Sequence, residues 1–335
     1  MSACCSSASY PSQPDPPRRP VSRWRAIAGA AALAAALTAC TGSTTTDQAD
    51  TPAVPDPGFG HVHGRGLNPG DDLVYAATHH GVFRLTPGGP QRVADRYQDT
   101  MGFTITGPDA FLGSGHPDPR ESGPPRPGLI RSGDRAQTWT PVALRGEVDF
   151  HSLSATGATV YGWDSTSGAV LRSDDDGATW VRGTSLALTG LDADPSDPAC
   201  VLGASEAGLA ESRDGGVTFH PFTPQPPEPL VLLDHVDGFL GAAEPTTDNG
   251  AATSAPGASD QAGSAPGAAP VAGVDAGGTV WTLAAGRWSR AGALSGPPEA
   301  FTVAGDGRFL AATAAGVHFS TDAGRSWPRI AATTS

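Results

Sequence analysis

The residues best suited to chemistry in this sequence are its histidines, which gather in one stretch of the chain. A neutral imidazole binds Cu, Zn or Ni, and a nearby thioether such as that of Met101 favours reduced copper. The carboxylate of Asp149 or Asp118 is placed to orient a ligating imidazole from the second shell. Six of the nine histidines lie in this stretch, namely His61, His63, His79, His80, His116 and His151.

Three interpretations of this cluster are open from the sequence. The first is a metal site, with copper or zinc as the candidate ions. The second is a site for an acidic sugar or another carboxylate, which charged and neutral imidazoles bind well. The third is purely structural, because buried histidines often satisfy the backbone groups of loops.

The composition excludes several function classes. The 335 residues contain 21 basic side chains, all of them Arg, and 34 acidic ones, for a net charge of -13. Without lysine there is neither a Schiff-base nucleophile nor a phosphate-binding P-loop. The acidic balance argues against nucleic acid as a partner.

The first 39 residues are typical of an export signal. Four arginines within residues 18–25 precede an apolar run, Ala26–Leu37, which is too short to span a bilayer. Leu37-Thr38-Ala39-Cys40 resembles a bacterial lipobox, in which the cysteine receives a diacylglyceryl group. The prediction is an extracytoplasmic lipoprotein anchored to the membrane through Cys40; an ordinary secretory signal is the alternative. Residues 40–58 are then expected to be a disordered tether.

A short motif recurs four times after the tether. It reads Ser-x-Asp-x-Gly-x-Thr-Trp and is complete at residues 173–180. A short Asp accepts hydrogen bonds from the amides of its own turn, Gly takes a positive φ, and Trp packs between sheets. The motif is therefore interpreted as a structural hairpin turn. Its predicted residues are Ser132, Asp134, Trp139, Ser173, Asp175, Gly177, Trp180, Ser212, Asp214, Gly216, Phe219, Ser320, Asp322, Gly324 and Trp327.

The motifs belong to a longer repeat. A glycine that opens an apolar strand recurs at intervals of about 40 residues, which is the length of a four-stranded propeller blade. The one long interval contains an Ala/Gly/Ser/Pro-rich segment, 245–273, which is interpreted as a disordered insert in the loop between the second and third strands of blade five. Residues 59–332 are thus predicted to form an all-β, six-bladed β-propeller; seven blades are the alternative.

The propeller topology places the histidines. In each blade, the first strand begins on the same face where the second strand ends. His61, His63, Met101 and His151 open first strands, whereas His79, His80 and His116 follow second strands. We therefore expect all of them on one face beside the central channel, with the Ser-x-Asp turns on the opposite face.

The four motifs resemble the Asp-box, or BNR, repeats of sialidases, of the Vps10 domain of sortilin and of photosystem II assembly-factor propellers. The stretches around His61–Gly64, Ala77–Gly81, Met101–Thr104, Gly113–Pro117 and Asp149–His151 resemble a bacterial lipoprotein family of such propellers that is often labelled glycosyl hydrolase. The resemblance implies the propeller fold, whereas the hydrolase label rests on the fold alone.

Two function classes follow. The first is an anchored binding module that engages a metal, a glycan or a protein partner. The alternative is a sialidase-like glycoside hydrolase, which would need an arginine triad and a Tyr nucleophile paired with Glu. The triad cannot be assembled from this sequence, and Tyr75 lies in an apolar strand pattern. Asp118, Asp149, Asp164 and Glu206 are the candidate carboxylates on the histidine-bearing face.

Overall fold

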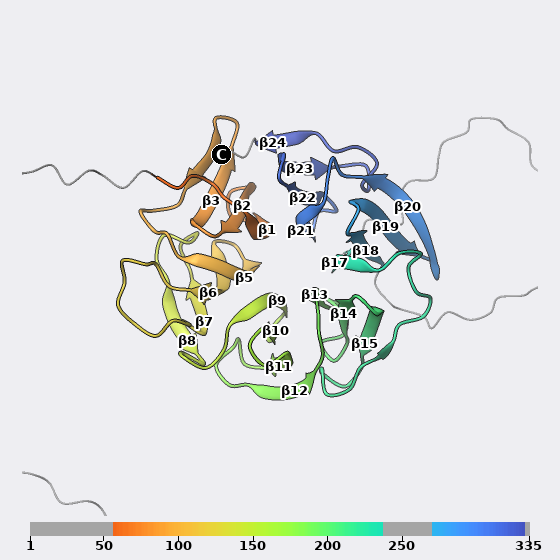
Figure 1. The fold of residues 1–335 in the computed structure, drawn as a ribbon, viewed down its shortest axis with the longest axis horizontal. Coiled ribbons are helices and arrows are strands. Elements are labelled where there is room, and N and C mark those ends of the chain that lie inside the picture. Colours follow the sequence, from red (N-terminus) through yellow and green to blue (C-terminus); the bar gives the residue numbers. More distant parts are fainter. Residues whose placement is uncertain (1–55, 237–269, 332–335) are drawn as a thin grey trace, which may run out of the picture. The chain divides into compact units, whose positions relative to one another are not determined.

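A computed structural model describes residues 56–236 and 270–331 of the chain. Over these residues the secondary structure consists of the strands β1 to β24, which form six four-stranded antiparallel sheets arranged around a central axis (Figure 1). The prediction of an all-β, six-bladed propeller is confirmed. No helix in these two ranges is long and apolar enough to cross a membrane.

Each blade takes four consecutive strands, with the first innermost. Blade one contains β1 (Val62–Asn68), β2 (Leu73–Thr78), β3 (Gly81–Thr86) and β4 (Gly89–Arg92). Blade two contains β5 (Asp99–Gly107), β6 (Ala110–His116), β7 (Leu129–Ser132) and β8 (Thr140–Ala143). Blade three contains β9 (Phe150–Thr156), β10 (Thr159–Asp164), β11 (Ala169–Ser173) and β12 (Val181–Ser185).

The other three blades follow the same order. Blade four contains β13 (Gly190–Ala193), β14 (Val201–Ser205), β15 (Gly208–Ser212) and β16 (His220–Pro221). Blade five contains β17 (Leu230–His235), β18 (Val271–Asp275), β19 (Thr279–Ala284) and β20 (Arg287–Ala293). Blade six contains β21 (Pro298–Val303), β22 (Phe309–Thr313), β23 (Gly316–Ser320) and β24 (Arg329–Ala331).

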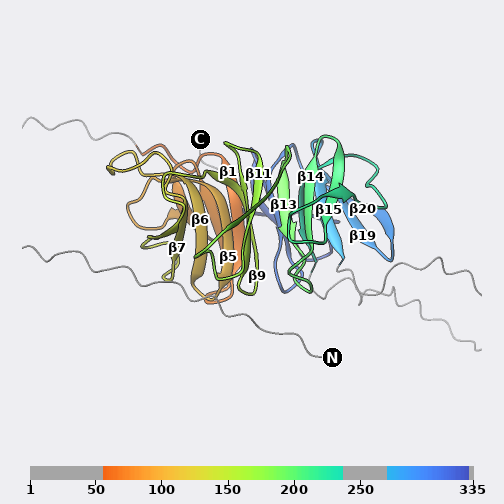
Figure 2. The ribbon, with the colours of Figure 1, turned by 90° about the horizontal axis from the view of Figure 1, so that it is seen from below.

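The ring has two faces, between which the strands run (Figure 2). The innermost strands β1, β5, β9, β13, β17 and β21 contact one another in turn around the axis. We call the face where these strands begin the histidine face. The opposite face, which carries the turns between the third and fourth strands of each blade, is called the turn face.

Hydrophobic packing between neighbouring blades holds the ring together. The buried apolar residues divide into six clusters, and each cluster joins two adjacent blades. Trp180 shows the pattern, because it lies against the cluster that combines Leu112 and Leu129 of blade two with Phe150 of blade three. Its ring centroid is 5.1 Å from that of Phe150. The propeller is thus stabilised at its interfaces, because each single sheet is too thin to bury a core of its own.

The Ser-x-Asp turns share one hydrogen-bond pattern. In blade three, Ser173 Oγ donates to Asp175 Oδ1 at 2.7 Å and accepts from Gly177 N at 2.9 Å. Asp175 Oδ1 also accepts from Thr179 N at 2.8 Å. The turns that begin at Ser132, Ser212 and Ser320 repeat these contacts. In the first of them, Ala136 adopts a φ of 65° where the motif has glycine.

These turns make an acid-sensitive contribution to stability. Hydrogen bonds from the amide and hydroxyl of Thr179 lower the pKa of Asp175 from its ordinary 3.8 to about 2. A carboxylate whose pKa falls on folding stabilises the fold above pH 3.8, and this contribution disappears as the pH falls through about 2. We therefore expect Asp175→Asn to unfold at lower urea than wild type at pH 7, with a gap that shrinks towards pH 2. Asp176→Asn in the same turn is the matched control, and a gap that does not change with pH contradicts the prediction.

The ring closes without strand exchange, since every sheet is built from four consecutive strands. Blade six therefore meets blade one without strand pairing. Arg65 of β1 donates to the carbonyl of Leu310 in β22, and Glu299 Oε2 accepts from Val62 N at 3.1 Å. A cluster that includes Phe59, Val62 and Leu310 fills the space between the two blades.

Two predicted boundaries need correction. The insert was expected to reach residue 273 and to lie between the second and third strands of blade five, but Val271–Gly273 belong to β18. The connection runs from β17 to β18, so its ends lie at the turn face and not at the histidine face. Asp56 was assigned to the tether. Its Oδ2 instead lies 2.6 Å from Nη1 of Arg92, so this residue forms an ion pair with blade one. The leader 1–39, Cys40 and the rest of the tether and insert lie outside the described residues.

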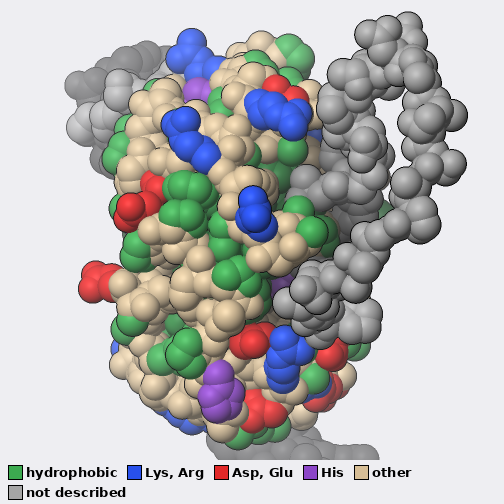
Figure 3. All heavy atoms as spheres, turned by 90° about the vertical axis from the view of Figure 1, so that its right-hand side faces the viewer, with side chains coloured by type: hydrophobic (Ala, Val, Ile, Leu, Met, Phe, Trp, Pro, Cys, Tyr) green, Lys and Arg blue, Asp and Glu red, His purple; other side chains and the backbone are tan. Residues whose placement is uncertain are grey.

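The outer wall of the ring is mixed in charge on the side that carries β15 and β20. Acidic, basic and hydrophobic side chains are interspersed there (Figure 3). Exposed large hydrophobic residues are confined to Val181 and Val217 within the described ranges. The described residues visible on this side therefore form neither a single-sign patch nor a broad apolar one.

Candidate functional site

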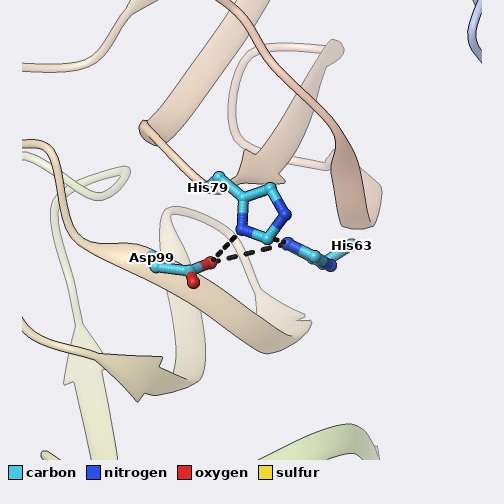
Figure 4. Close-up of side chains that lie close together, drawn as sticks. All are labelled: His63, His79 and Asp99. Carbon is cyan, nitrogen blue, oxygen red and sulfur yellow. Dashed lines mark hydrogen bonds and ion pairs between the residues drawn. The ribbon is translucent and has the colours of Figure 1, made fainter. Parts of the chain in front are cut away.

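A group of two histidines and one aspartate lies on the histidine face between blades one and two. His63 is in β1, His79 is in the turn after β2, and Asp99 opens β5. His63 Nε2 is 3.1 Å from His79 Nδ1. Asp99 Oδ1 is 3.5 Å from His63 Nε2 and 3.1 Å from His79 Nδ1. Figure 4 shows the three side chains pointing toward one another, and we call them the triad.

The triad continues into a network of alternating imidazoles and carboxylates. His116 Nδ1 is 3.1 Å from Asp99 Oδ2, and its Nε2 is 3.4 Å from Asp149 Oδ2. That same oxygen of Asp149 is 3.2 Å from His151 Nε2. This network of side chains therefore extends from blade one through blade two to blade three.

Burial sets the protonation of the central imidazole. The side chain of His63 is only 10% exposed. Its burial, together with the neighbouring His79, lowers its pKa from 6.5 to about 4, although Asp99 acts in the opposite direction. His63 is therefore neutral at pH 7, and the neutral imidazole is the form that binds a metal ion.

Asp99 contributes an oxygen without a hydrogen bond. Its Oδ1 is buried, and no group within the described residues donates to it with hydrogen-bond geometry. Buried polar atoms of native proteins nearly always have a partner, so an exception points to a role beyond folding. This oxygen faces both imidazoles of the triad.

The turn that carries His79 is fixed from below by Arg92. Arg92 Nε donates to the carbonyl of His80 at 2.8 Å, and its guanidinium lies over the ring of Tyr97 at 4.1 Å. Thr78 Oγ1 accepts from His80 N at 3.0 Å and donates to the carbonyl of Gly81 at 2.9 Å. The position of His79 is thus set by the contacts that Arg92 and Thr78 make with the backbone of the next two residues.

The sequence-predicted residues separate into three groups. The first group belongs to the network described above and consists of His63, His79, His116, His151 and Asp149. His61 lies beside the triad, with its ring centroid 4.9 Å from that of His63. His80 is the exception among the histidines, since its ring lies against Gly60. His63, His116 and His151 do not meet at one point, because His116 lies between Asp99 and Asp149 and His151 stands at the far end of the network.

Met101 lines the central channel. Together with His63 and His151 it borders a cavity of about 320 Å³, which also meets Arg65, Asp192 and Asp234. The channel therefore opens at the histidine face next to the triad.

The other predicted carboxylates have structural partners or lie elsewhere. Asp118 pairs with Arg120 at 2.7 Å, and this guanidinium, the first of several hydrogen-bonding groups, keeps the pKa of Asp118 well below its usual range. Asp164 accepts from Asp149 N at 3.0 Å and from the hydroxyls of its own turn. Glu206 borders a separate cavity of about 580 Å³ with Glu228 and Asp275.

Sequence reasoning missed two carboxylates of this face, Asp99 and Glu299. Glu299 Oε1 lies 3.3 Å from His61 Nδ1. Both residues stand at the start of an innermost strand, as Asp149 does at the entry to β9. Aligning the blades on the first residues of their innermost strands, and not only on the recurring glycines, would have revealed Asp99 and Glu299.

Comparison with known proteins identifies the fold. No model of a protein family matches the chain, and no curated protein matches its sequence. Similar solved structures include a chain of the nidogen/laminin complex, which is 15% identical with a TM-score of 0.52 and covers 75% of this chain and 89% of that one. A GH74 xyloglucanase from Xanthomonas campestris is 19% identical with a TM-score of 0.47, and covers 81% of this chain and 45% of that one. YCF48 bound to D1 peptide is 14% identical with a TM-score of 0.40, and covers 70% and 67%.

These likenesses concern the fold and not the activity. This chain spans less than half the length of the xyloglucanase. At such identities the shared feature is the arrangement of blades, on which many unrelated functions are built. The chain has the fold of a six-bladed β-propeller.

Proposed function

We propose that this protein is an extracytoplasmic, lipid-anchored binding module whose histidine face binds a transition-metal ion, zinc or copper. The observation that carries the proposal is the spacing of the three triad atoms, which are 3.1, 3.1 and 3.5 Å apart. Ligand atoms placed tetrahedrally around zinc at 2.0–2.1 Å are about 3.3 Å from one another. The side chains therefore need little rearrangement to hold an ion.

The neutral imidazole of His63 and the unpartnered oxygen of Asp99 favour a cation over an anion. His63 is neutral near pH 7, and Asp99 directs an oxygen without a hydrogen-bond donor at both imidazoles. A bound cation satisfies that oxygen and both nitrogen lone pairs at once. His116 contacts the other oxygen of Asp99 at 3.1 Å and so orients the carboxylate from the second shell.

The choice between zinc and copper depends on further ligands. Imidazole and carboxylate together suit zinc or oxidised copper, whereas a thioether favours reduced copper. Met101 borders the channel cavity together with His63, so among the described residues it is the candidate for a sulfur ligand on this face. The membrane location rests on the lipobox around Cys40 and on the leader before it.

The proposal predicts metal binding that depends on the triad. Titration calorimetry of the purified chain with Zn²⁺ and Cu²⁺ is expected to show saturable binding of one ion. His63→Ala and Asp99→Asn each remove a ligand and are expected to weaken it by roughly 100-fold. His220→Ala removes an exposed histidine of blade four and serves as the control. If neither ion binds, or if His63→Ala and His220→Ala behave alike, the proposal is wrong.

A further inference from the structure

A fourth side chain stands next to the triad and is tied to a different blade. His61 immediately precedes β1, and its ring centroid lies 4.9 Å from that of His63 and 5.7 Å from that of His79. Its Nδ1 is 3.3 Å from Oε1 of Glu299, which belongs to β21 of blade six. The pair therefore connects the triad to the seam where the last blade meets the first.

Glu299 is held in place, whereas His61 has room to move. The side chain of Glu299 is 16% exposed, and its Oε2 accepts a hydrogen bond from Val62 N at 3.1 Å. The side chain of His61 is 46% exposed. In the structure its nitrogens are not part of the group whose ligand atoms all lie within 4.8 Å of one another. A side-chain rotation is needed to bring it to an ion held by the triad.

The contact with Glu299 selects the nitrogen that is free to bind. When Nδ1–H donates to a carboxylate, a neutral imidazole keeps its lone pair on Nε2. Ligating histidines almost always donate their other ring N–H in this way, which fixes the tautomer and raises the basicity of the ligand. The 3.3 Å ion-pair distance between Nδ1 of His61 and Oε1 of Glu299 places the two groups close enough to form this hydrogen bond.

From this arrangement we infer that His61 supplies the fourth ligand of the metal ion through Nε2 and that Glu299 is its positioning residue. The inference rests on the proposed function, because it concerns the same ion. It specifies a four-coordinate site of three imidazoles and one carboxylate, with ligands or their support drawn from blades one, two and six. Such a site leaves no open position and is typical of ions that are held and not used in catalysis.

Co²⁺ provides the test, because its visible absorption is much stronger in four-coordinate sites than in six-coordinate ones. The purified chain is titrated with Co²⁺ and then with Zn²⁺ by competition. Wild type is expected to give the strong four-coordinate spectrum. His61→Ala is expected to weaken the spectrum and to lower Zn²⁺ affinity by roughly 10- to 100-fold, and Glu299→Gln by roughly tenfold.

The double variant separates positioning from general support of the fold. If Glu299 acts through His61, then His61→Ala/Glu299→Gln binds Zn²⁺ no more weakly than His61→Ala alone. A Glu299 that only supports the seam lowers the unfolding temperature without changing the Co²⁺ spectrum, and that result overturns the inference. Glu121→Gln, which removes an exposed carboxylate paired with Arg96, is the control for loss of a carboxylate.

The outcomes also distinguish the two proposals. A wild-type chain that binds neither Co²⁺ nor Zn²⁺ overturns the metal-binding function itself. A wild type that binds Zn²⁺, with His61→Ala unchanged in affinity and spectrum, overturns the role of His61 and leaves the triad intact. Because His61 is half exposed, His61→Ala is expected to fold normally and keeps the test valid even if Glu299→Gln is unstable.

Discussion

Replacing Asp234 with alanine is expected to lower the free energy of unfolding at pH 4 by about 3 kcal/mol, whereas Asp234→Asn is expected to change it by less than about 1 kcal/mol at the same pH. Asp234 lies in β17 of blade five, and its Oδ2 accepts from Val303 N of blade six at 2.7 Å. The hydroxyl of Thr302 donates to the same oxygen. Alanine leaves both donors without a partner at a buried interface, while asparagine keeps an acceptor oxygen.

The pH dependence of the two variants provides a sharper criterion. Burial, followed by the nearby charge of Asp192, raises the pKa of Asp234 well above its ordinary value of 3.8. An acid whose pKa rises on folding is most favourable to the fold below pH 3.8, and its contribution is lost as the pH rises through the folded-state pKa. Asparagine mimics the protonated form at every pH. Asp234→Asn should therefore gain stability relative to wild type as the pH rises.

Urea unfolding from pH 4 to pH 9, followed by tryptophan fluorescence, measures this difference. The expected curves for wild type and Asp234→Asn lie close together at pH 4 and separate at higher pH, with the variant more stable. If wild type gains stability relative to the variant as the pH rises, Asp234 is an ionised, favourable group and the argument fails.

The fold was predictable because its determinants are local. Each Ser-x-Asp turn closes its own hydrogen bonds within a few residues, so Ser173, Asp175 and Thr179 indicate the hairpin without knowledge of its surroundings. The recurrence of a strand-opening glycine about every 40 residues then gives the number of blades. Even the face of the histidines follows from strand order, since antiparallel strands return to the same side every second strand.

The details of the site were less predictable because they depend on contacts between blades. His116 reaches Asp99 within its own blade and Asp149 of the neighbouring blade. Glu299 contacts His61 across 238 residues of sequence, as the ring closes. Repeat spacing predicts which end of a strand a residue occupies, but the rotation of each blade about its own axis decides which side chains meet. His80 illustrates the limit, since it is adjacent to His79 and yet faces Gly60.

The placement of the insert failed for a related reason. Its low-complexity composition marked the segment but not its ends, because Val271, Ala272 and Gly273 continue the small and apolar pattern into β18. Once three residues of a strand are counted as loop, the preceding strand is assigned to the wrong position in the blade. The prediction consequently moved the connection from the turn face to the histidine face.

The second large effect is expected from Gly115→Ala, which should destabilise the fold by about 3 kcal/mol and disrupt the histidine face at the same time. Gly115 precedes His116 in β6 and adopts a φ of 136°, which side chains rarely allow. A Cβ atom at this position would lie 2.3 Å from the carbonyl oxygen of Asp99 and 2.7 Å from the amide nitrogen of Met101. Both are backbone atoms of β5, so no side-chain rotation relieves the clash.

The irregular pairing of β5 with β6 explains why the glycine is needed. Thr100 pairs with Gly115 and Gly102 with Ser114, so Met101 is the extra residue of a bulge. At this bulge, the backbone of β5 between Asp99 and Met101 lies directly against Gly115. Alanine must push this strand away, and Asp99 then moves relative to both His79 and His116. The loss of Zn²⁺ affinity in Gly115→Ala should therefore be at least tenfold, beyond what reduced stability explains.

Gly107→Ala is the matched control, because Gly107 lies in the same pair of strands and an added Cβ there meets no atom within 4 Å. Its free energy of unfolding should stay within about 0.5 kcal/mol of wild type, with unchanged Zn²⁺ binding. Urea unfolding and Zn²⁺ calorimetry on the two variants, compared at a temperature where both are folded, decide the matter. Equal behaviour of Gly115→Ala and Gly107→Ala would mean that the bulge does not hold Asp99 in place. A loss of stability without a loss of affinity would mean that the triad tolerates a displaced β5.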